Sequence, residues 1–192
     1  MKGETMKNTL MIVVLTLALL ATGSASWAEN NVENPAFARW KTFQPGAMVR
    51  YQEVLHWDET LIETQITFTL LERNDDKVVL EKATAEFERG VAQPARTERI
   101  EYLARVSGGD PMVANVPEAE IVQGGLEELE IAGRKMKCRV EESWIRQGKD
   151  SAYTRSFFNK AIPGWLAKQV EGMDSPRPVI HRTLQVVDFR SQ

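Results

Sequence analysis

The chain has 192 residues, of which 43% are hydrophobic and 27% are charged, and its formal net charge is −3. These values suit one ordinary globular domain and exclude a disordered polyampholyte, a collagen-like fibre and a protein with several membrane spans. The small acidic excess argues against nucleic-acid binding, which requires a basic surface. A single cysteine excludes a disulfide scaffold.

Residues 1–28 have the pattern of an export signal. Two lysines form a charged start, an apolar run follows from Leu10 to Leu20, and small residues lead to a cleavage motif that ends at Ala28. The run is shorter than the roughly 20 residues that cross a bilayer as a helix. We therefore expect a periplasmic or secreted protein, with no transmembrane segment after cleavage and a single antiparallel β domain over residues 29–192.

A short helix is predicted at the start of this domain. Asn34 is a good helix N-cap, and Pro35 suits the first helical position. Phe37, Trp40 and Phe43 recur every three residues, which places three aromatic side chains in one stripe. A helix of about nine residues is marginal alone, so we expect it to lie on an apolar surface as a lid or plug.

After Gly46 the hydrophobic period changes to two, which is typical of β-strands. Four consecutive strands are predicted, and a turn-forming Asn-Asp-Asp sequence at 74–76 separates the second from the third. These strands cover residues 48–57, 60–72, 77–89 and 96–106. In the third strand, the side chains predicted to share one face are Val79, Ala83, Ala85 and Phe87.

A Gly- and Pro-rich loop is predicted over residues 107–117, and strands follow it again. A tight turn is predicted at Ala132-Gly133, and a wider one from Gly172 to Pro178. The remaining strands are expected before residue 131 and over residues 134–146, 151–160, 166–170 and 179–190. The pattern predicts a mainly β fold: a single antiparallel curved sheet, or a partly open barrel, of eight to ten strands with one short N-terminal helix.

No residue has the spacing that catalysis or metal binding requires. Cys138 shares the parity of its apolar neighbours, which favours a buried, unreactive thiol over a redox thiol or an intermolecular disulfide. His56 and His181 lack chelating neighbours and are expected to be partly exposed, with a site formed by both across two strands as the alternative. The nucleophile motif GxSxG is absent. We therefore expect no catalytic residue, no metal, no cofactor and no enzymatic activity.

Charged residues of both signs face each other across the predicted hairpin. The acidic set is Glu127, Glu128, Glu130, Glu141 and Glu142, and the basic set is Arg134, Lys135, Lys137 and Arg139. Cross-strand pairing on the solvent face explains both sets. Paired catalytic carboxylates are the alternative.

The aromatic residues give the remaining indication of function. One short helix cannot cover eight strands, so the sheet must enclose a dry core or leave an apolar groove on its concave face. The candidate groove and lid residues are Phe37, Trp40, Phe43, Trp57, Phe68 and Trp144. A groove of this kind suits an acyl chain or another extended hydrophobic molecule.

The export signal, the short aromatic helix and the long run of amphipathic strands together resemble the periplasmic lipoprotein-carrier (LolA/LolB-like) superfamily. The hairpin over 124–138 and the segment Ile162-Pro163-Gly164-Trp165-Leu166 resemble parts of small exported β proteins of unknown function. The first resemblance implies an exported protein that binds a lipid or acyl chain. Our alternative hypothesis is a cell-envelope module that binds a protein partner or has a structural role.

Overall fold

The computed structural model describes residues 31–57, 59–88, 90–107, 120–147, 150–174 and 180–191. The predicted export signal and most of the predicted 107–117 loop lie outside these residues. Residues Asn31–Gln192 form one compact unit. Among the described residues, no helix has the length and hydropathy needed to cross a bilayer.

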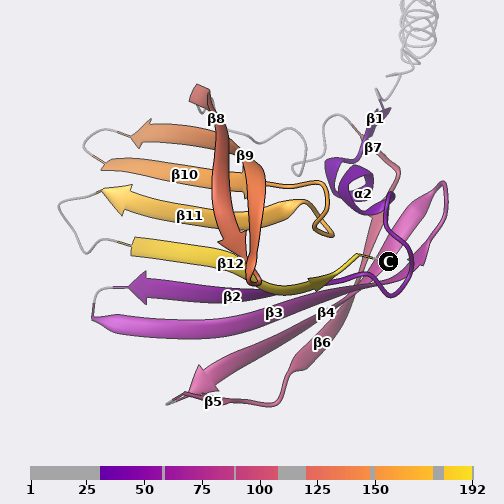
Figure 1. Cartoon of the computed structure of the whole chain (residues 1–192), viewed down its shortest axis with the longest axis horizontal. Coiled ribbons are helices and arrows are strands. Elements are labelled where there is room, and N and C mark those ends of the chain that lie inside the picture. The colour runs from indigo at the N-terminus through magenta and orange to yellow at the C-terminus, as the bar shows by residue number, and fades with distance from the viewer. Residues whose placement is uncertain are drawn as a thin grey trace, which may run out of the picture. The chain divides into compact units, whose positions relative to one another are not determined.

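The described residues are mainly β-strand (Figure 1). The one helix described is α2 (Pro35–Trp40), and β1 (Asn31–Glu33) pairs with β7 (Arg105–Ser107) in a small sheet of two strands. The main sheet contains β2 (Met48–Trp57), β3 (Thr60–Arg73), β4 (Lys77–Glu88), β5 (Val91–Ala92), β6 (Arg96–Leu103), β8 (Glu120–Ile131), β9 (Arg134–Gln147), β10 (Asp150–Phe158), β11 (Leu166–Asp174) and β12 (Ile180–Arg190).

The main sheet is antiparallel and open. Its strand order is β5-β4-β3-β2-β12-β11-β10-β9-β8, and β6 also pairs with β4. The C-terminal β12 therefore lies beside β2 and joins the two meanders, β2–β6 and β8–β11, into one sheet. This arrangement confirms the predicted fold class, and the sheet does not close on itself.

The N-terminal helix begins as predicted and ends earlier. The side chain of Asn34 accepts a hydrogen bond from the amide of Ala36 at 2.9 Å, and Pro35 is the first helical residue. The helix has six residues, and Phe43 lies in the turn that follows it. Phe37, Trp40 and Phe43 are only 5%, 6% and 6% exposed, so the aromatic stripe is part of the hydrophobic core.

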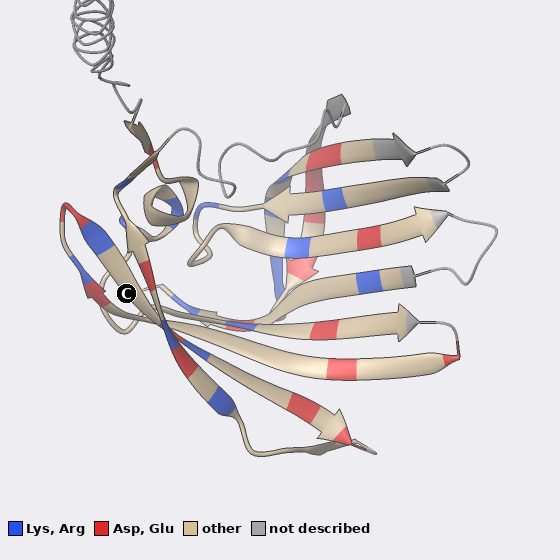
Figure 2. Cartoon of the chain, turned by 180° about the vertical axis from the view of Figure 1, so that it is seen from behind, with Lys and Arg blue, Asp and Glu red and all other residues tan. Residues whose placement is uncertain are grey.

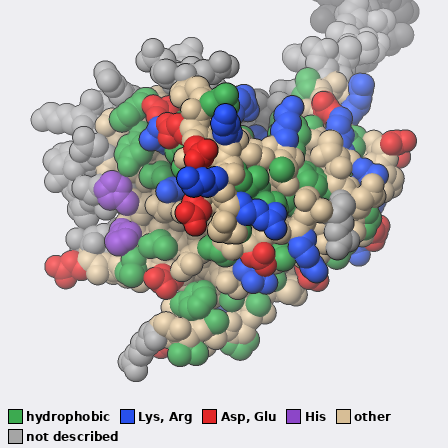
Figure 3. Space-filling view, viewed as in Figure 1, with side chains coloured by type: hydrophobic (Ala, Val, Ile, Leu, Met, Phe, Trp, Pro, Cys, Tyr) green, Lys and Arg blue, Asp and Glu red, His purple; other side chains and the backbone are tan. Residues whose placement is uncertain are grey.

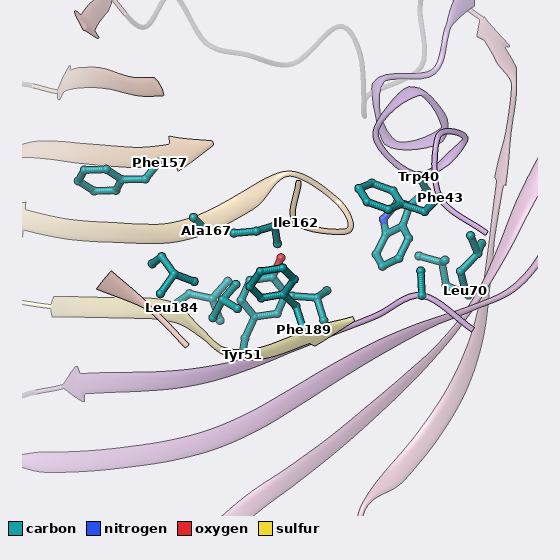
Figure 4. Packing of buried hydrophobic residues seen from close by; sticks show 14 of the residues in the cluster. Trp40, Phe43, Tyr51, Leu70, Phe157, Ile162, Ala167, Leu184 and Phe189 are labelled. Atoms are coloured by element: carbon teal, nitrogen blue, oxygen red, sulfur yellow. The ribbon is translucent and has the colours of Figure 1, made fainter. Parts of the chain in front are cut away.

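The core lies between this helix and the sheet. Figure 4 shows Trp40 and Phe43 facing Leu70, while Ile162 and Ala167 lie above Tyr51 and Leu184. The same core receives Ile131, Cys138 and Val140 from the β8–β9 hairpin. The hairpin tip lies over β12, where the Arg134 guanidinium is 5.4 Å from the Phe189 ring centroid.

In β4, Val79, Ala83 and Ala85 share one face as predicted, but the face that belongs to the core cluster is the opposite one, with Val78 and Leu80. The reason is the register: Leu80 pairs directly with Leu70 of β3, so both point to the same side. Gly172 was predicted in a turn, but it lies within β11, opposite Tyr153.

Gly172 is inside a strand because of its cross-strand neighbour. A Cβ atom at this position would lie 2.3 Å from Cε1 of Tyr153, well below any van der Waals contact. The Tyr153 ring therefore lies on the glycine backbone, which only a residue without a side chain permits. A glycine of this kind has the same sequence signature as a turn glycine, which explains the wrong prediction.

Candidate functional site

An apolar groove lies between α2 and the sheet. Its volume is about 220 Å³. The residues that line it come from the helix, from β2, β3, β4, β6, β11 and β12, and from the β10–β11 loop: Ala36, Arg39, Trp40, Tyr51, Phe68, Leu80, Tyr102, Gly164, Leu166 and Leu184. The helix therefore forms one wall and the sheet the other.

Trp40 is held at this wall by close packing. Its ring is 6.4 Å from that of Phe43 at an interplanar angle of 65°, an edge-to-face contact. On the other side, a Cβ atom on Gly164 would lie 3.3 Å from the indole. Gly164 also has a φ of 76°, which favours glycine. The Ile-Pro-Gly-Trp-Leu segment is therefore shaped to receive Trp40.

Tyr51 forms the base of the groove. Its hydroxyl donates a hydrogen bond to the Leu166 carbonyl at 3.0 Å, and its ring contacts Phe68 edge to face at 6.2 Å. Burial raises the pKa of Tyr51 far above its ordinary value, against an opposing effect of the Arg39 charge. Burial also raises the pKa of Tyr102. Both hydroxyls therefore stay neutral, and neither is poised as a base.

The structure separates the six predicted site residues. Trp40 and Phe68 line the groove together. Phe37 and Phe43 lie in the core beside it. Trp57 is the last residue of β2, where its backbone pairs with Thr60, and its side chain lies outside the described part of the structure.

Trp144 lies on β9 and contacts a different ring. Its centroid is 5.3 Å from that of Tyr153 on β10. The two rings, with Glu142, Thr154 and Arg155, line a separate cavity of about 200 Å³. Trp144 and the groove residues therefore belong to two different places on the sheet.

Local patterns in the chain predict only some of the other lining residues. Tyr51 and Tyr102 lie on the apolar parity of their strands, so their burial follows from the period-two pattern. Leu80 lies on the parity opposite to the predicted one, and Leu184 became a groove residue only because β12 pairs with β2. Arg39 was missed because a single arginine in a short helix has no distinctive spacing.

The hairpin charges pair differently from the prediction. Lys135 pairs with Glu128 at 3.8 Å across the two strands, as expected. Glu127 and Glu142, however, both bind Arg155 of β10, with the Glu142 contact at 2.9 Å. Residues of both charge signs are spread over the strands of the sheet (Figure 2). These two acidic residues are therefore both ion-pair partners of Arg155.

The cysteine and the histidines occupy the predicted environments. Cys138 is fully buried, and desolvation raises the pKa of its thiol, which makes it unreactive. His56 and His181 are exposed and lie directly opposite each other in β2 and β12 (Figure 3). In the described part of the chain, no group of three or more potential ligand residues could hold a metal ion.

The chain was compared with known proteins. No family model and no curated protein matches it. A hypothetical protein from Chlamydia trachomatis is similar in structure, with a TM-score of 0.37 and 9% identity over 85% of this chain and 94% of that chain.

Two further solved structures are similar to this chain. One is a putative outer membrane lipoprotein-sorting protein domain from Vibrio parahaemolyticus, with a TM-score of 0.30 and 11% identity over 81% of this chain and 88% of that chain. The other is a DUF1329 family protein from Desulfovibrio piger, with a TM-score of 0.27 and 12% identity over 79% and 87% of the respective chains. Similarity at this level carries no argument about a family, a site or a ligand.

Proposed function

We propose that this protein is exported to the periplasm or secreted and binds a hydrophobic ligand, an acyl chain or a similar molecule, without catalysing a reaction. The observation that carries the proposal is the groove beside α2, whose walls are mostly aromatic and aliphatic. Burial of apolar surface contributes roughly 25 cal/mol per Å² to binding. The tyrosine hydroxyls in the groove are neutral, which favours a lining that excludes water over one that transfers protons.

We propose further that α2 acts as a movable cover. The groove, at about 220 Å³, is smaller than the roughly 300–1,000 Å³ of typical ligand pockets. A helix of six residues is not stable by itself and depends on its packing. A shift of Trp40 away from Gly164 would enlarge the groove, and the bound chain would replace the packing that Trp40 loses.

The binding test uses a neutral, environment-sensitive dye such as Nile red. Ala36 lines the groove from the helix, and Ala38, two residues along, does not. We expect Ala36→Phe to fill the groove and weaken dye binding about tenfold, which corresponds to about 1.4 kcal/mol. Ala38→Phe is the matched control and should leave binding unchanged. Equal dye binding by the wild type and both variants would contradict the proposal.

The cover is tested separately by amide hydrogen exchange. The Lys41 amide donates to the Phe37 carbonyl at 2.9 Å, so its exchange reports on the last turn of α2. A saturating acyl ligand should change exchange in residues 35–41 more than in β12. Unchanged exchange on binding would show that the helix is a fixed wall.

A second candidate function is protein binding by the envelope module of our alternative hypothesis. Its supporting observation is a group of exposed apolar side chains on strand ends remote from the core cluster: Leu61, Ile62, Trp144 and Met173. Capture of one stoichiometric protein partner, lost on Ile62→Lys and accompanied by no lipid, would favour this function over ligand binding.

A further inference from the structure

One cation stands at the edge of the apolar groove. Arg39 is in the last turn of α2 and lines the groove together with Trp40. Its guanidinium carbon is 5.4 Å from the centroid of the Phe158 ring. It is close enough to Tyr51 that its positive charge partly offsets the effect of burial on that hydroxyl. The guanidinium therefore acts electrostatically on the inside of the groove.

Two cations near the groove are paired with carboxylates, whereas Arg39 has no such pair among the described residues. Arg139 lies on the same Phe158 ring at 5.5 Å, but it also pairs with Glu141 at 2.7 Å. Lys82, whose charge acts on Tyr102 in the groove, pairs with Glu98 at 2.7 Å. Within the described residues, no carboxylate lies within ion-pair distance of Arg39.

An unpaired guanidinium beside an apolar pocket is complementary to a particular ligand. Partial desolvation of a charge is unfavourable unless a counter-charge compensates it. A planar guanidinium forms two parallel hydrogen bonds with a carboxylate or phosphate, which makes the contact strong and directional. A groove of about 220 Å³ suits a ligand with one hydrocarbon chain better than a ligand with two.

We propose that the groove selects single-chain amphiphiles with an oxyanion headgroup, a carboxylate or a phosphate, and that Arg39 holds this headgroup at the mouth. The inference rests on the hydrophobic-ligand function proposed above. The chain lies against Phe68 and Leu184, and the oxyanion accepts hydrogen bonds from Arg39. The uncharged hydroxyls of Tyr51 and Tyr102 keep the interior free of charge, so the headgroup stays at the edge.

The experiment measures displacement of Nile red from the purified protein by four ligands with the same C12 chain, each below its micelle concentration. Dodecanoate and dodecyl phosphate are the two anions, dodecanol is the neutral ligand, and dodecyltrimethylammonium is the cation. We expect the anions to bind about tenfold more tightly than the alcohol, the size of one charge-assisted contact, and the cation to bind most weakly. Salt at 1 M should reduce these differences. The two anionic arms show whether a fatty-acid or a phosphate headgroup is preferred.

Two variants locate the effect. Arg39→Gln should reduce the anion preference to below about twofold, because it weakens anion binding far more than dodecanol binding. Arg139→Gln, on the same Phe158 ring, should keep the full preference. Equal binding of anion and alcohol by the wild type, or a preference that survives in Arg39→Gln, overturns the headgroup inference alone. Failure of the dye and of all four ligands to bind overturns both this inference and the proposed function. Because the wild-type ligand series is decisive alone, the test does not depend on the folding of a variant.

Discussion

Two short segments of neighbouring strands show how differently the two ends of the sheet are built. At the helix end, the part of the sheet next to α2, the consecutive β4 residues Val78, Val79 and Leu80 are all at most 1% exposed. At the free end, the opposite ends of these strands, the consecutive β3 residues Leu61 and Ile62 are 53% and 39% exposed. Because successive strand residues point to opposite faces, the sheet is covered on both faces at the helix end and on neither at Ile62.

The cover of the second face at the helix end is made of charged side chains. Val79 pairs with Glu72 on one side and Glu101 on the other. These carboxylates bind Arg99 at 2.6 Å and Lys77 at 2.7 Å. The aliphatic stems of the two cations can then shield the valine while their charged groups stay in water. Buried apolar residues therefore stabilise the helix end, whereas the free end contributes surface.

The free end of the sheet nevertheless has a continuous row of paired residues. One transverse row runs through Trp144, Tyr153, Gly172, His181 and His56, each paired with the next across five strands. The Tyr153 ring lies on Gly172, and Trp144 lies on Tyr153. This row stiffens a single-layered part of the sheet without burying it.

The largest predicted difference between the two ends of the sheet is in the stability lost when a tryptophan side chain is removed. Trp40→Ala removes a core side chain that is 6% exposed, and we expect it to lower the free energy of unfolding by about 3–5 kcal/mol. Trp144→Ala, at 42% exposed, should cost about 1 kcal/mol or less, the size of one ring contact. Urea unfolding of both variants checks this. Similar losses for the two would contradict the division of the sheet.

A smaller effect is expected from a methyl group at the free end. Gly172→Ala places Cβ against the Tyr153 ring and should cost about 1–3 kcal/mol through overpacking. Tyr153→Ala in the same chain removes the clash, so the double variant should be more stable than the sum of the two single effects predicts. Additive effects in the urea-unfolding cycle would show that the ring does not depend on the glycine.

The buried thiol gives a pH-dependent prediction at the helix end. Burial raises the pKa of Cys138 in the folded protein, so above the ordinary thiol pKa of about 8.5 the unfolded chain ionises first. The free energy of unfolding should therefore fall as pH rises above this value, and Cys138→Ala should show a flatter pH profile. A thiol reagent should label unfolded but not folded protein. Rapid labelling of the native protein would contradict the burial.

The smallest effects concern the hairpin ion pairs. Arg155 binds both Glu127 and Glu142 and is partly buried, so Arg155→Gln should cost about 1 kcal/mol. Lys135→Gln breaks an exposed pair at 3.8 Å and should change the stability by only a few tenths of a kcal/mol. Thermal unfolding of both variants measures the difference. An equal effect would mean that Arg155 does not join the hairpin to β10.

Much of the fold follows from local signals in the sequence. Asn34 and Pro35 predict the start of the helix, and Ala132-Gly133 predicts the hairpin turn, where both residues have positive φ. The parity of Cys138 predicts its burial. These succeed because caps, turns and two-residue periodicity depend on neighbours within a few positions. The assignment of Gly172 failed because its partner, Tyr153, is 19 positions away in the sequence.

The candidate site was predictable only in part. Trp40 and Phe68 could be named as groove residues from their amphipathic patterns, but the same reasoning grouped Trp144 with them. Patterns within one strand give a side chain's face and not its distance from side chains on other strands. Arg39 has no local signal, because what distinguishes it is that no carboxylate of the described residues pairs with it in space.

Local patterns in the amino-acid sequence specify the class of the protein: a mainly β chain with a short capped N-terminal helix, a buried cysteine and no motif for catalysis or metal binding. Where these parts meet depends on the tertiary structure. The pairing of β12 with β2 joins the two meanders and brings Leu184 beside Tyr51 in one groove. The tertiary structure also decided that Arg39, at the edge of the groove, has no carboxylate partner among the described residues. Register between distant strands fixes the first of these outcomes, because hydrophobic periodicity specifies the face of a strand but not its partner.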